Sequence, residues 1–344
     1  MTHKLLTSSK AFDSRTGKAR GLDYLLVRDN DQPILISSRS VTPEPSPRLD
    51  KKALKQWSAR LPLDFVSAGE RDMRESLQHN LHRTHQDQVQ YIMTSEKLLS
   101  WLEKPELGLL VRQCQTAPQT QANAMSLSSA FLAQSLRQSH DSPVLHHSCG
   151  LRTEEGPRRA DTSGTIAVIN SLNSQLAHQL QNHTDLSFLG TNKYCGRSQT
   201  RLRPALKLLK RLVDEVSENE SVFIIIDSLS RMSGDAEDEG QAIRCISRLV
   251  DRSAAPLVKV LLTDLLPDHT PQLSADGDEL YVPDRVDVGG QGLNTEYLHE
   301  VSKASIGRFE ARRRGGGSAS DFGSSSEESA SSDSDVDTSS DDSD

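Results

Sequence analysis

Apolar and polar positions alternate most regularly between residues 107 and 312. Short, strongly apolar segments of strand length occur at residues 107–111 (LGLLV), 144–149 (VLHHSC), 222–226 (VFIII) and 258–262 (VKVLL). Between them, apolar residues recur at helical spacing in residues 126–138, 165–180, 202–216, 237–251 and 299–312. Strands that alternate with helices predict an α/β fold, in which a parallel sheet of about five strands has helices on both faces.

A fifth strand is predicted at residues 280–288 (LYVPDRVDV). Pro283 interrupts it and cannot donate to a ladder of hydrogen bonds, so we expect an edge strand. Upstream, residues 68–101 carry apolar side chains at roughly helical spacing and predict one or two amphipathic helices. Residues 1–60 alternate short apolar patches with polar and Pro-containing stretches, and predict disorder with a local hairpin around residues 24–27 and 34–36.

These patterns divide the chain into four regions. We expect a mostly disordered region at residues 1–60, a helical linker at 61–106, an α/β domain at 107–314 and a disordered acidic tail at 315–344. The acidic tail is rich in Ser, holds nine acidic residues and has no Lys or Arg. Without it the formal charge changes from −8 to +1, so the acidity of the chain belongs to the tail. A nearly neutral body gives no clear signature of nucleic-acid binding.

Composition excludes several other classes. The four cysteines are far apart and form no C-x-x-C pair, which indicates free thiols in a reducing compartment. Adjacent His146 and His147 point to opposite faces of a strand, so they do not predict a metal site with Cys149. No segment approaches the ~20 apolar residues that span a bilayer, and the first apolar run is too short for a secretory signal. We therefore expect an intracellular protein that does not bind a membrane and that lies in the cytoplasm rather than the nucleus.

The order of the apolar strands resembles a known family. A strand GLLV, a later strand VFIIID and then VKVLLTD resemble the first, Walker B and sensor strands of P-loop NTPases of the fungal NACHT/STAND type. SEKLLSWLEKPELGLLV, SPVLHHSCG and GTIAVINSLNSQLAHQL resemble other parts of the same domains. The resemblance covers residues 68–312. It implies a P-loop NTPase-like fold and a site for ATP or GTP with Mg²⁺.

The phosphate loop that this resemblance implies is degenerate. A Walker A loop reads GxxxxGK[ST], and its lysine and backbone amides hold the phosphates. Residues 110–148 contain neither glycine nor lysine, and the best superposition places Gln119 at the first glycine and Ala124, Met125 and Ser126 at Gly-Lys-Ser. Ser126, at the Mg²⁺ ligand position, is the only matching residue. Its alternative role is to cap the helix that follows.

The other two motifs are altered as well. Asp227 occupies the metal-binding position of Walker B, or alternatively caps the turn after the strand. Ser228 and Ser230 stand where a water-activating carboxylate is expected, so no general base remains there. Thr263 keeps the polar sensor position, or satisfies a local backbone group, but Asp264 and Leu265 replace the serine and arginine that end this strand in the family. Arg231 lies close in sequence as a substitute for the arginine.

Further sequence features leave alternatives open. The acidic run at Asp235, Glu237, Asp238 and Glu239 is either a Ca²⁺ or Mg²⁺ cluster or the favourable first turn of the next helix. In the acidic tail, Ser325 precedes Glu328 and Ser334 precedes Asp337 by three positions, a spacing typical of substrates of acidophilic kinases.

Three functions follow from these observations. The first is a non-catalytic, degenerate NTPase-like domain that acts through protein partners and needs no cofactor. The second is a STAND-type signalling switch that still binds Mg-nucleotide through Ser126, Asp227 and Thr263. The third is an interaction protein whose working part is the acidic tail. Hydrolysis is the least expected activity, because both the phosphate clamp and the catalytic acid are replaced.

Overall fold

A computed structural model describes most of the chain between residues 51 and 315. The described ranges are 51–79, 81–114, 123–139, 141–152, 163–251, 256–263, 278–286 and 293–315, together with the backbone of 6–12, 19–29 and 32–37. The acidic tail beyond Gly315 lies outside them.

The centre of the molecule is a five-stranded sheet in which every pair of neighbouring strands is parallel. The strand order is β5-β6-β7-β4-β8. The strands are β4 (Gly108–Cys114), β5 (Val144–Ser148), β6 (Ser221–Asp227), β7 (Leu257–Thr263) and β8 (Asp278–Val282). The predicted α/β fold with a parallel sheet of about five strands is therefore confirmed. β8 pairs only with β4 and stops before Pro283, so the predicted edge strand is confirmed too.

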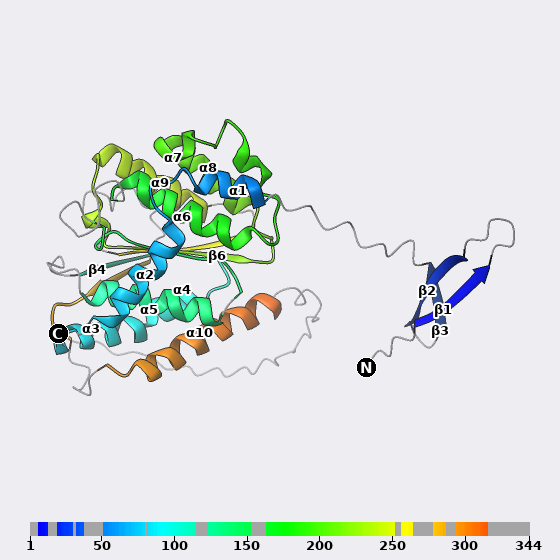
Figure 1. Cartoon of the computed structure of the whole chain (residues 1–344). Coiled ribbons are helices and arrows are strands. Elements are labelled where there is room, and N and C mark those ends of the chain that lie inside the picture. The colour runs from blue at the N-terminus through cyan, green and yellow to red at the C-terminus, as the bar shows by residue number, and fades with distance from the viewer. Residues whose placement is uncertain are drawn as a thin grey trace, which may run out of the picture.

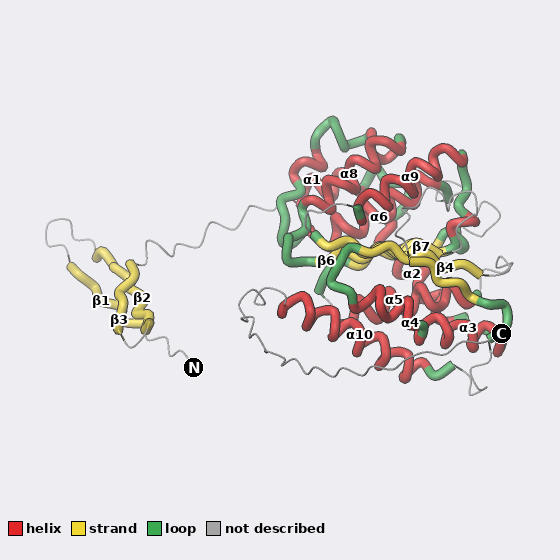
Figure 2. Tube along the Cα trace, turned by 180° about the vertical axis from the view of Figure 1, so that it is seen from behind, coloured by secondary structure: helices red, strands yellow, loops and turns green. Residues whose placement is uncertain are grey.

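Helices cover both faces of this sheet (Figures 1 and 2). The upper layer in Figure 1 consists of α1 (Lys51–Ser58), α6 (Thr165–Leu180), α7 (Arg197–Thr200), α8 (Leu202–Asp214) and α9 (Ala236–Val250). The lower layer consists of α3 (Arg83–Thr94), α4 (Glu96–Glu103), α5 (Ala124–Ser139) and α10 (Thr295–Gly315). α2 (Phe65–Gln78) crosses the edge of the sheet beside β5 and contacts α6 of the upper layer and α5 of the lower layer. One or two helices were predicted in residues 68–101, and the structure has three helices in this part of the chain: α2, α3 and α4. No described helix is both long and apolar enough to cross a membrane.

The connections between strands decide which helix lies on which face. Parallel strands are joined by right-handed crossovers, so the direction of travel along the sheet fixes the face. The chain passes from β4 over two strands to β5 through α5, and then returns through α6 and α8 to β6 and through α9 to β7. The connection after β4 therefore takes the opposite face from those after β5 and β6. In open α/β sheets, ligand sites lie beyond the carboxyl ends of the strands at such a reversal.

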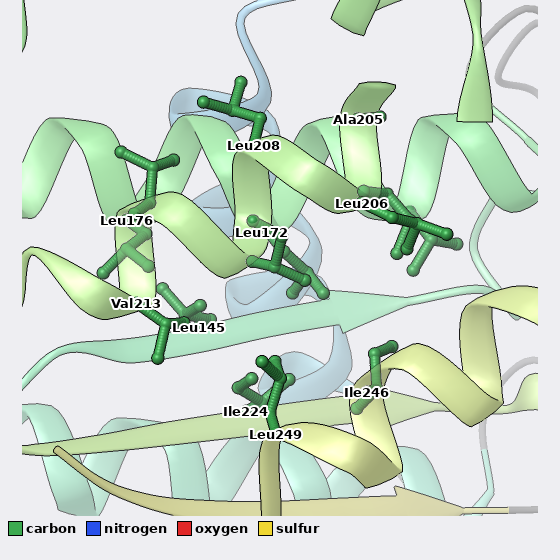
Figure 3. Packing of buried hydrophobic residues seen from close by; sticks show 14 of the residues in the cluster. Leu145, Leu172, Leu176, Ala205, Leu206, Leu208, Val213, Ile224, Ile246 and Leu249 are labelled. Carbon is green, nitrogen blue, oxygen red and sulfur yellow. The ribbon is translucent and has the colours of Figure 1, made fainter. Parts of the chain in front are cut away.

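Because side chains alternate along a strand, each strand contributes to two cores. In β6, Val222, Ile224 and Ile226 belong to the core under the upper helices. Phe223 and Ile225 belong to the core above the lower helices. Figure 3 shows the upper core, where Leu172 and Leu176 of α6 and several side chains of α8 and α9 lie over Leu145 and Ile224. Burial on both faces explains why these strands read as continuous apolar runs.

The N-terminal region contains structure that the sequence predicted only in part. The expected hairpin is present: β2 (Ala19–Asp29) pairs with β3 (Gln32–Ser37), with Val27 opposite Ile34. A further strand, β1 (Leu6–Phe12), pairs antiparallel with β2. Within the region predicted to be mostly disordered, residues Lys51–Ser58 form α1. Its Trp57 is buried and donates from Nε1 to Ser198 Oγ at 3.0 Å, which ties α1 to the upper layer.

Candidate functional site

Three neighbouring strands end in a polar side chain on the same face of the sheet. Ser148 ends β5, Asp227 ends β6 and Thr263 ends β7. Asp227 lies two residues after Ile225, and Thr263 two after Leu261, both of which face the lower core. The alternation of side chains therefore turns these polar groups toward α5. The apolar runs thus bring three polar residues to one place at the carboxyl edge of the sheet.

Asp227 is the centre of this cluster. Its Oδ2 accepts hydrogen bonds from Ser126 Oγ at 2.7 Å, Ser148 Oγ at 2.9 Å and Ser228 Oγ at 3.1 Å. Its Oδ1 accepts from Thr263 Oγ1 at 2.8 Å. The carboxylate is fully buried, and two oxygens offer about four lone-pair positions in total. Four hydroxyl donors therefore use the accepting capacity of Asp227, and we call these five residues the Asp227 cluster.

The structure brings together Ser126, Asp227 and Thr263, the three residues predicted from the sequence. Ser126 is not the helix N-cap, because α5 begins at Ala124 and Asn123 lies before it. Asn123 Oδ1 accepts from the backbone amide of Ser126 at 2.9 Å, which is the bond a capping side chain makes. Ser126 thus stands in the first turn with its hydroxyl aimed at Asp227. The capping role predicted as its alternative is wrong and belongs to Asn123.

Thr263 fulfils a local structural role as well. Its Oγ1 accepts the backbone amide of Ser228 at 2.9 Å while it donates to Asp227. Ser228 has φ 57° and ψ 53°, a left-handed conformation that is unusual for a residue other than glycine. The two bonds made by Ser228, from its amide and from its hydroxyl, hold this strained turn at the end of β6.

A buried cation lies close to the Asp227 cluster. Arg112 of β4 is fully buried, and its two terminal nitrogens donate to Ser128 Oγ at 2.7 Å and Ser129 Oγ at 2.8 Å on α5. Burial lowers the pKa of Arg112 to about 10, and the negative charge of Asp227 opposes that shift. The guanidinium therefore remains charged at neutral pH. It is held by α5 hydroxyls, whereas a Walker lysine projects from the phosphate loop.

The titratable groups on β5 are kept neutral. Burial lowers the pKa of His146 to about 4, with Asp227 opposing the shift and Arg137 adding to it. Burial also lowers the pKa of His147 well below its usual value, and raises that of the Cys149 thiol. All four cysteines are free thiols, as predicted. A thiol that stays protonated is a poor nucleophile, so Cys149 packs as a small apolar side chain.

The remaining sequence candidates have other places. Asp235 caps α9 by accepting from the Glu237 amide at 2.9 Å, and Glu237, Asp238 and Glu239 form the first turn of that helix. Their charges are favourable there because of the helix dipole. Arg231 lies beside Gly150, where a β-carbon on Gly150 would come within 3.6 Å of Arg231 Cδ. Gln119, Asp264 and Leu265 lie outside the described residues.

The Asp227 cluster contains no basic side chain that would pair with a phosphate group. The side chains that bond to Asp227 are all neutral hydroxyls, and no described group of three or more His, Cys, Asp or Glu side chains could hold a metal ion. A cavity of about 850 Å³ lies away from the cluster and is lined by residues of α1, α2 and α6. The hydrogen bonds of the cluster join α5 to the carboxyl ends of β5, β6 and β7.

Three contributors were missed by sequence reasoning. Ser148 ends a strand, as many serines do, and only its pairing with Asp227 on the neighbouring strand identifies it. Asn123 stands before an apolar-periodic run and matches the usual signal for an N-cap. Arg112 follows the apolar run of β4, and its even spacing from Leu110 was a signal that it points toward the lower helices.

Comparisons with known proteins identify no relative. No protein-family model matches the sequence, and a search of curated proteins finds no significant match. The class that the fold defines is an open parallel α/β sheet covered on both faces. The function must be argued from the residues themselves.

Proposed function

We propose that this chain is a non-catalytic NTPase-like protein that acts through contacts with other proteins. The observation that carries the proposal is that the side chain of Asp227 already accepts hydrogen bonds within the fold. The residue at the Walker B position accepts four hydroxyl donors from its own chain. The segment that would hold phosphates, residues 110–148, has no lysine or glycine. Residues that bind Mg-nucleotide in the NACHT/STAND type here join α5 to three strands.

The loss of a phosphate site has a physical reason. A triphosphate needs a mobile cation and several free backbone amides. Arg112 is a buried cation within residues 110–148, and its terminal nitrogens donate to Ser128 and Ser129. Met125, at the lysine position, is itself fully buried in the lower core. To pair with Arg112, a phosphate group would have to take its donors away from the Ser128 and Ser129 hydroxyls.

A protein contact has an available surface on the sheet edge. β8 is an edge strand, and Tyr281 on it is 51% exposed. An exposed aromatic side chain on an unpaired edge is the kind of feature that a partner segment can use. The proposal further places the protein in the cytoplasm, as a member of the fungal NACHT/STAND type.

Nucleotide binding by the full chain tests the proposal. We expect fluorescent ATP and GTP analogues with Mg²⁺ to show no saturable binding, and millimolar Mg-ATP to leave the melting temperature unchanged. A ligand present at 100 times its Kd would add about 2.7 kcal/mol of stability, so a weak site would be seen. The matched variants are Asp227→Asn, which alters the cluster, and Ser139→Ala, a change farther along α5. Micromolar binding that is lost in Asp227→Asn and kept in Ser139→Ala would reject the proposal.

The same experiment decides on the second candidate, a nucleotide-dependent switch. Its specific support is the convergence of Ser126, Asp227 and Thr263, the three residues that the family resemblance assigns to nucleotide and metal. In that case Mg-nucleotide would have to replace hydroxyl donors on Asp227. Binding should then require Mg²⁺ and fall in Ser126→Ala.

A further inference from the structure

A basic groove lies on the outside of the upper helical layer, between α8 and α9. These helices contact each other above the sheet (Figure 1). A cavity of about 590 Å³ opens between them. The groove is lined by five exposed basic side chains: Arg203, Lys207 and Lys210 of α8, and Arg244 and Arg248 of α9.

The helical spacing explains how the charges gather. Positions 203, 207 and 210 lie on one face of α8, and 244 and 248 on one face of α9. The floor between them is apolar and consists of Leu206, Cys245 and Leu249. Leu206 and Leu249 also belong to the upper core (Figure 3), so the groove is part of a packed layer. Among the described residues that line it, none is acidic.

Five like charges on an apolar floor repel one another and attract an anionic occupant. The lining offers no aromatic side chain on which a nucleic-acid base could stack. A flexible acidic polypeptide suits this lining better than a nucleic acid.

The chain itself contains such a polypeptide. The acidic tail has nine carboxylates and no basic residue, while the rest of the chain has a formal charge of +1. Charge complementarity favours the acidic tail as the occupant.

The end of α10 lies where the tail can reach the groove. Arg313, near the end of this helix, donates to Ser221 Oγ at 2.6 Å and to the carbonyl oxygen of Glu218 at 3.4 Å. Ser221 begins β6, and Glu218 lies in the short connection between β6 and α8, which ends at Asp214. Lys210 and Arg248 stand near the ends of their helices, at this same edge of the sheet. The tail therefore begins at the edge of the sheet toward which α8 and α9 run.

The length of the tail is more than sufficient. The residues after Gly315 span at most about 95 Å when extended, at ~3.3 Å per residue. The basic positions of α8 cover only about 10 Å of helix, at ~1.5 Å per residue. A tether of this kind gives an effective concentration on the order of millimolar. Contacts that are individually weak are then enough for docking.

We propose that the acidic tail, residues 316–344, docks onto the basic groove between α8 and α9 of the same chain. The basic side chains of α8 and α9 hold the tail by charge, so docking does not require a particular order of residues in the tail. The docked tail covers Cys245 and excludes other acidic segments from the groove. This proposal does not depend on whether the Asp227 cluster binds nucleotide.

Zero-length crosslinking of the full chain tests the contact directly. A carbodiimide joins a lysine amine to a carboxylate only when the two touch. We expect crosslinks at low salt from Lys207 and Lys210 to acids of the tail, located by mass spectrometry. They should disappear in about 1 M NaCl, where the screening length is about 3 Å. Crosslinks spread evenly over exposed lysines, such as Lys303 on α10 in the other layer, would overturn the proposal. So would crosslinks that join isotope-labelled to unlabelled chains, which would assign the groove to a second copy.

The rate at which a neutral alkylating reagent modifies Cys245 gives an independent reading. We expect a several-fold increase when residues 316–344 are removed, and a similar increase in Arg203→Glu/Lys207→Glu. The matched control Arg71→Glu/Lys303→Glu makes the same charge change on α2 and α10, away from the groove, and should keep the wild-type rate. In the shortened chain, the groove substitutions should have no further effect, because there is no tail to displace. Equal rates in all folded variants, checked by circular dichroism, would reject docking. Docking would also be rejected if an added oligonucleotide changed the rate of Cys245 alkylation while removal of the tail did not.

Discussion

Arg152 Nε donates to Asp72 Oδ2 at 2.6 Å in a pair that is almost completely buried. The bond joins the turn after β5 to the middle of α2, so it connects the carboxyl edge of the sheet to the helix that crosses the edge of the sheet beside β5. A buried ion pair of this kind is costly to break on one side, because the other charge is left without compensation.

Removal of one partner should therefore destabilise the fold strongly. We expect Asp72→Ala to lower the free energy of unfolding by about 3–5 kcal/mol, measured by urea denaturation. The double variant Asp72→Leu/Arg152→Met should recover much of that loss, since no buried charge remains. Arg211→Ala, which breaks the exposed pair with Glu215, is the control and should cost less than about 1 kcal/mol. Similar losses for the buried and exposed pairs would contradict this view.

Ser126 should contribute to stability rather than to catalysis. Its hydroxyl makes a hydrogen bond to a buried carboxylate, a type of bond worth about 1.5–3 kcal/mol. We expect Ser126→Ala to lower the free energy of unfolding by that amount, and Ser139→Ala on the same helix to leave it nearly unchanged. Urea denaturation of both variants measures the difference. A Ser126→Ala variant as stable as the wild type would show that the bond to Asp227 does not hold α5 in place.

Lys259 should make stability rise with pH above neutrality. This lysine is buried on β7, where its Nζ donates to the carbonyl oxygens of Trp101 and Leu102 at the end of α4 and lies 5.1 Å from the ring centre of Phe309. Burial lowers its pKa to about 7, with Lys104 adding to the shift. The unfolded chain therefore binds one more proton than the native state between about pH 7 and the usual lysine pKa of ~10.4.

The sign of the effect follows from this proton. Unfolding takes up a proton in that window, so the free energy of unfolding increases with pH, by at most about 1.4 kcal/mol per pH unit from this group. We expect the difference between wild type and Lys259→Met to grow in favour of the wild type from pH 7 to pH 9. Guanidinium denaturation at several pH values measures it. Parallel curves for the two proteins would show that the lysine is charged in the folded state.

His146 should make the protein sensitive to acid. Its folded pKa is lowered to about 4 by burial, against about 6.5 in the unfolded chain. Within that window the unfolded chain binds the additional proton, so stability is complete above pH 6.5 and is lost as the pH falls toward 4. We expect His146→Leu to reduce the acid-dependent loss of stability between pH 6.5 and 4.5, as followed by thermal unfolding. The remaining slope is expected in part from His147, whose pKa is lowered in the same direction.

The sheet was predictable because its strands are buried on both faces. Runs such as VFIII need no partner to be recognised as strands, and the helix at residues 165–180 matches α6 at both ends. α5 begins two residues earlier than predicted, at Ala124, because these residues follow a polar run that hides the start of the helix. β1 and α1 were missed since their sequences, LTSSKAF and KKALKQWS, are mostly polar. α1 contributes only Ala53, Leu54 and Trp57 to the upper core.

The site was predictable only through the residues that end apolar runs. Asp227 and Thr263 close two strong strands, so their positions at the carboxyl edge followed from the pattern. Ser148 lies on a strand with two histidines, and its contact with Asp227 depends on strand pairing that no local signal reveals. The resemblance to a nucleotide site singled out Ser126, Asp227 and Thr263, and the structure brings these three side chains together. Their hydrogen bonds could not be foreseen, because they depend on how α5 is placed against the sheet.

The bonds from Arg313 to Ser221 and Glu218 fix the exit of the chain from the fold. They hold the end of α10 at the amino ends of the strands, on the side opposite to Asp227. A label or surface anchor attached after Gly315 would therefore leave the carboxyl ends of the strands facing outward. An immobilised molecule of this kind would present β5, β6 and β7 end-on to any partner in solution.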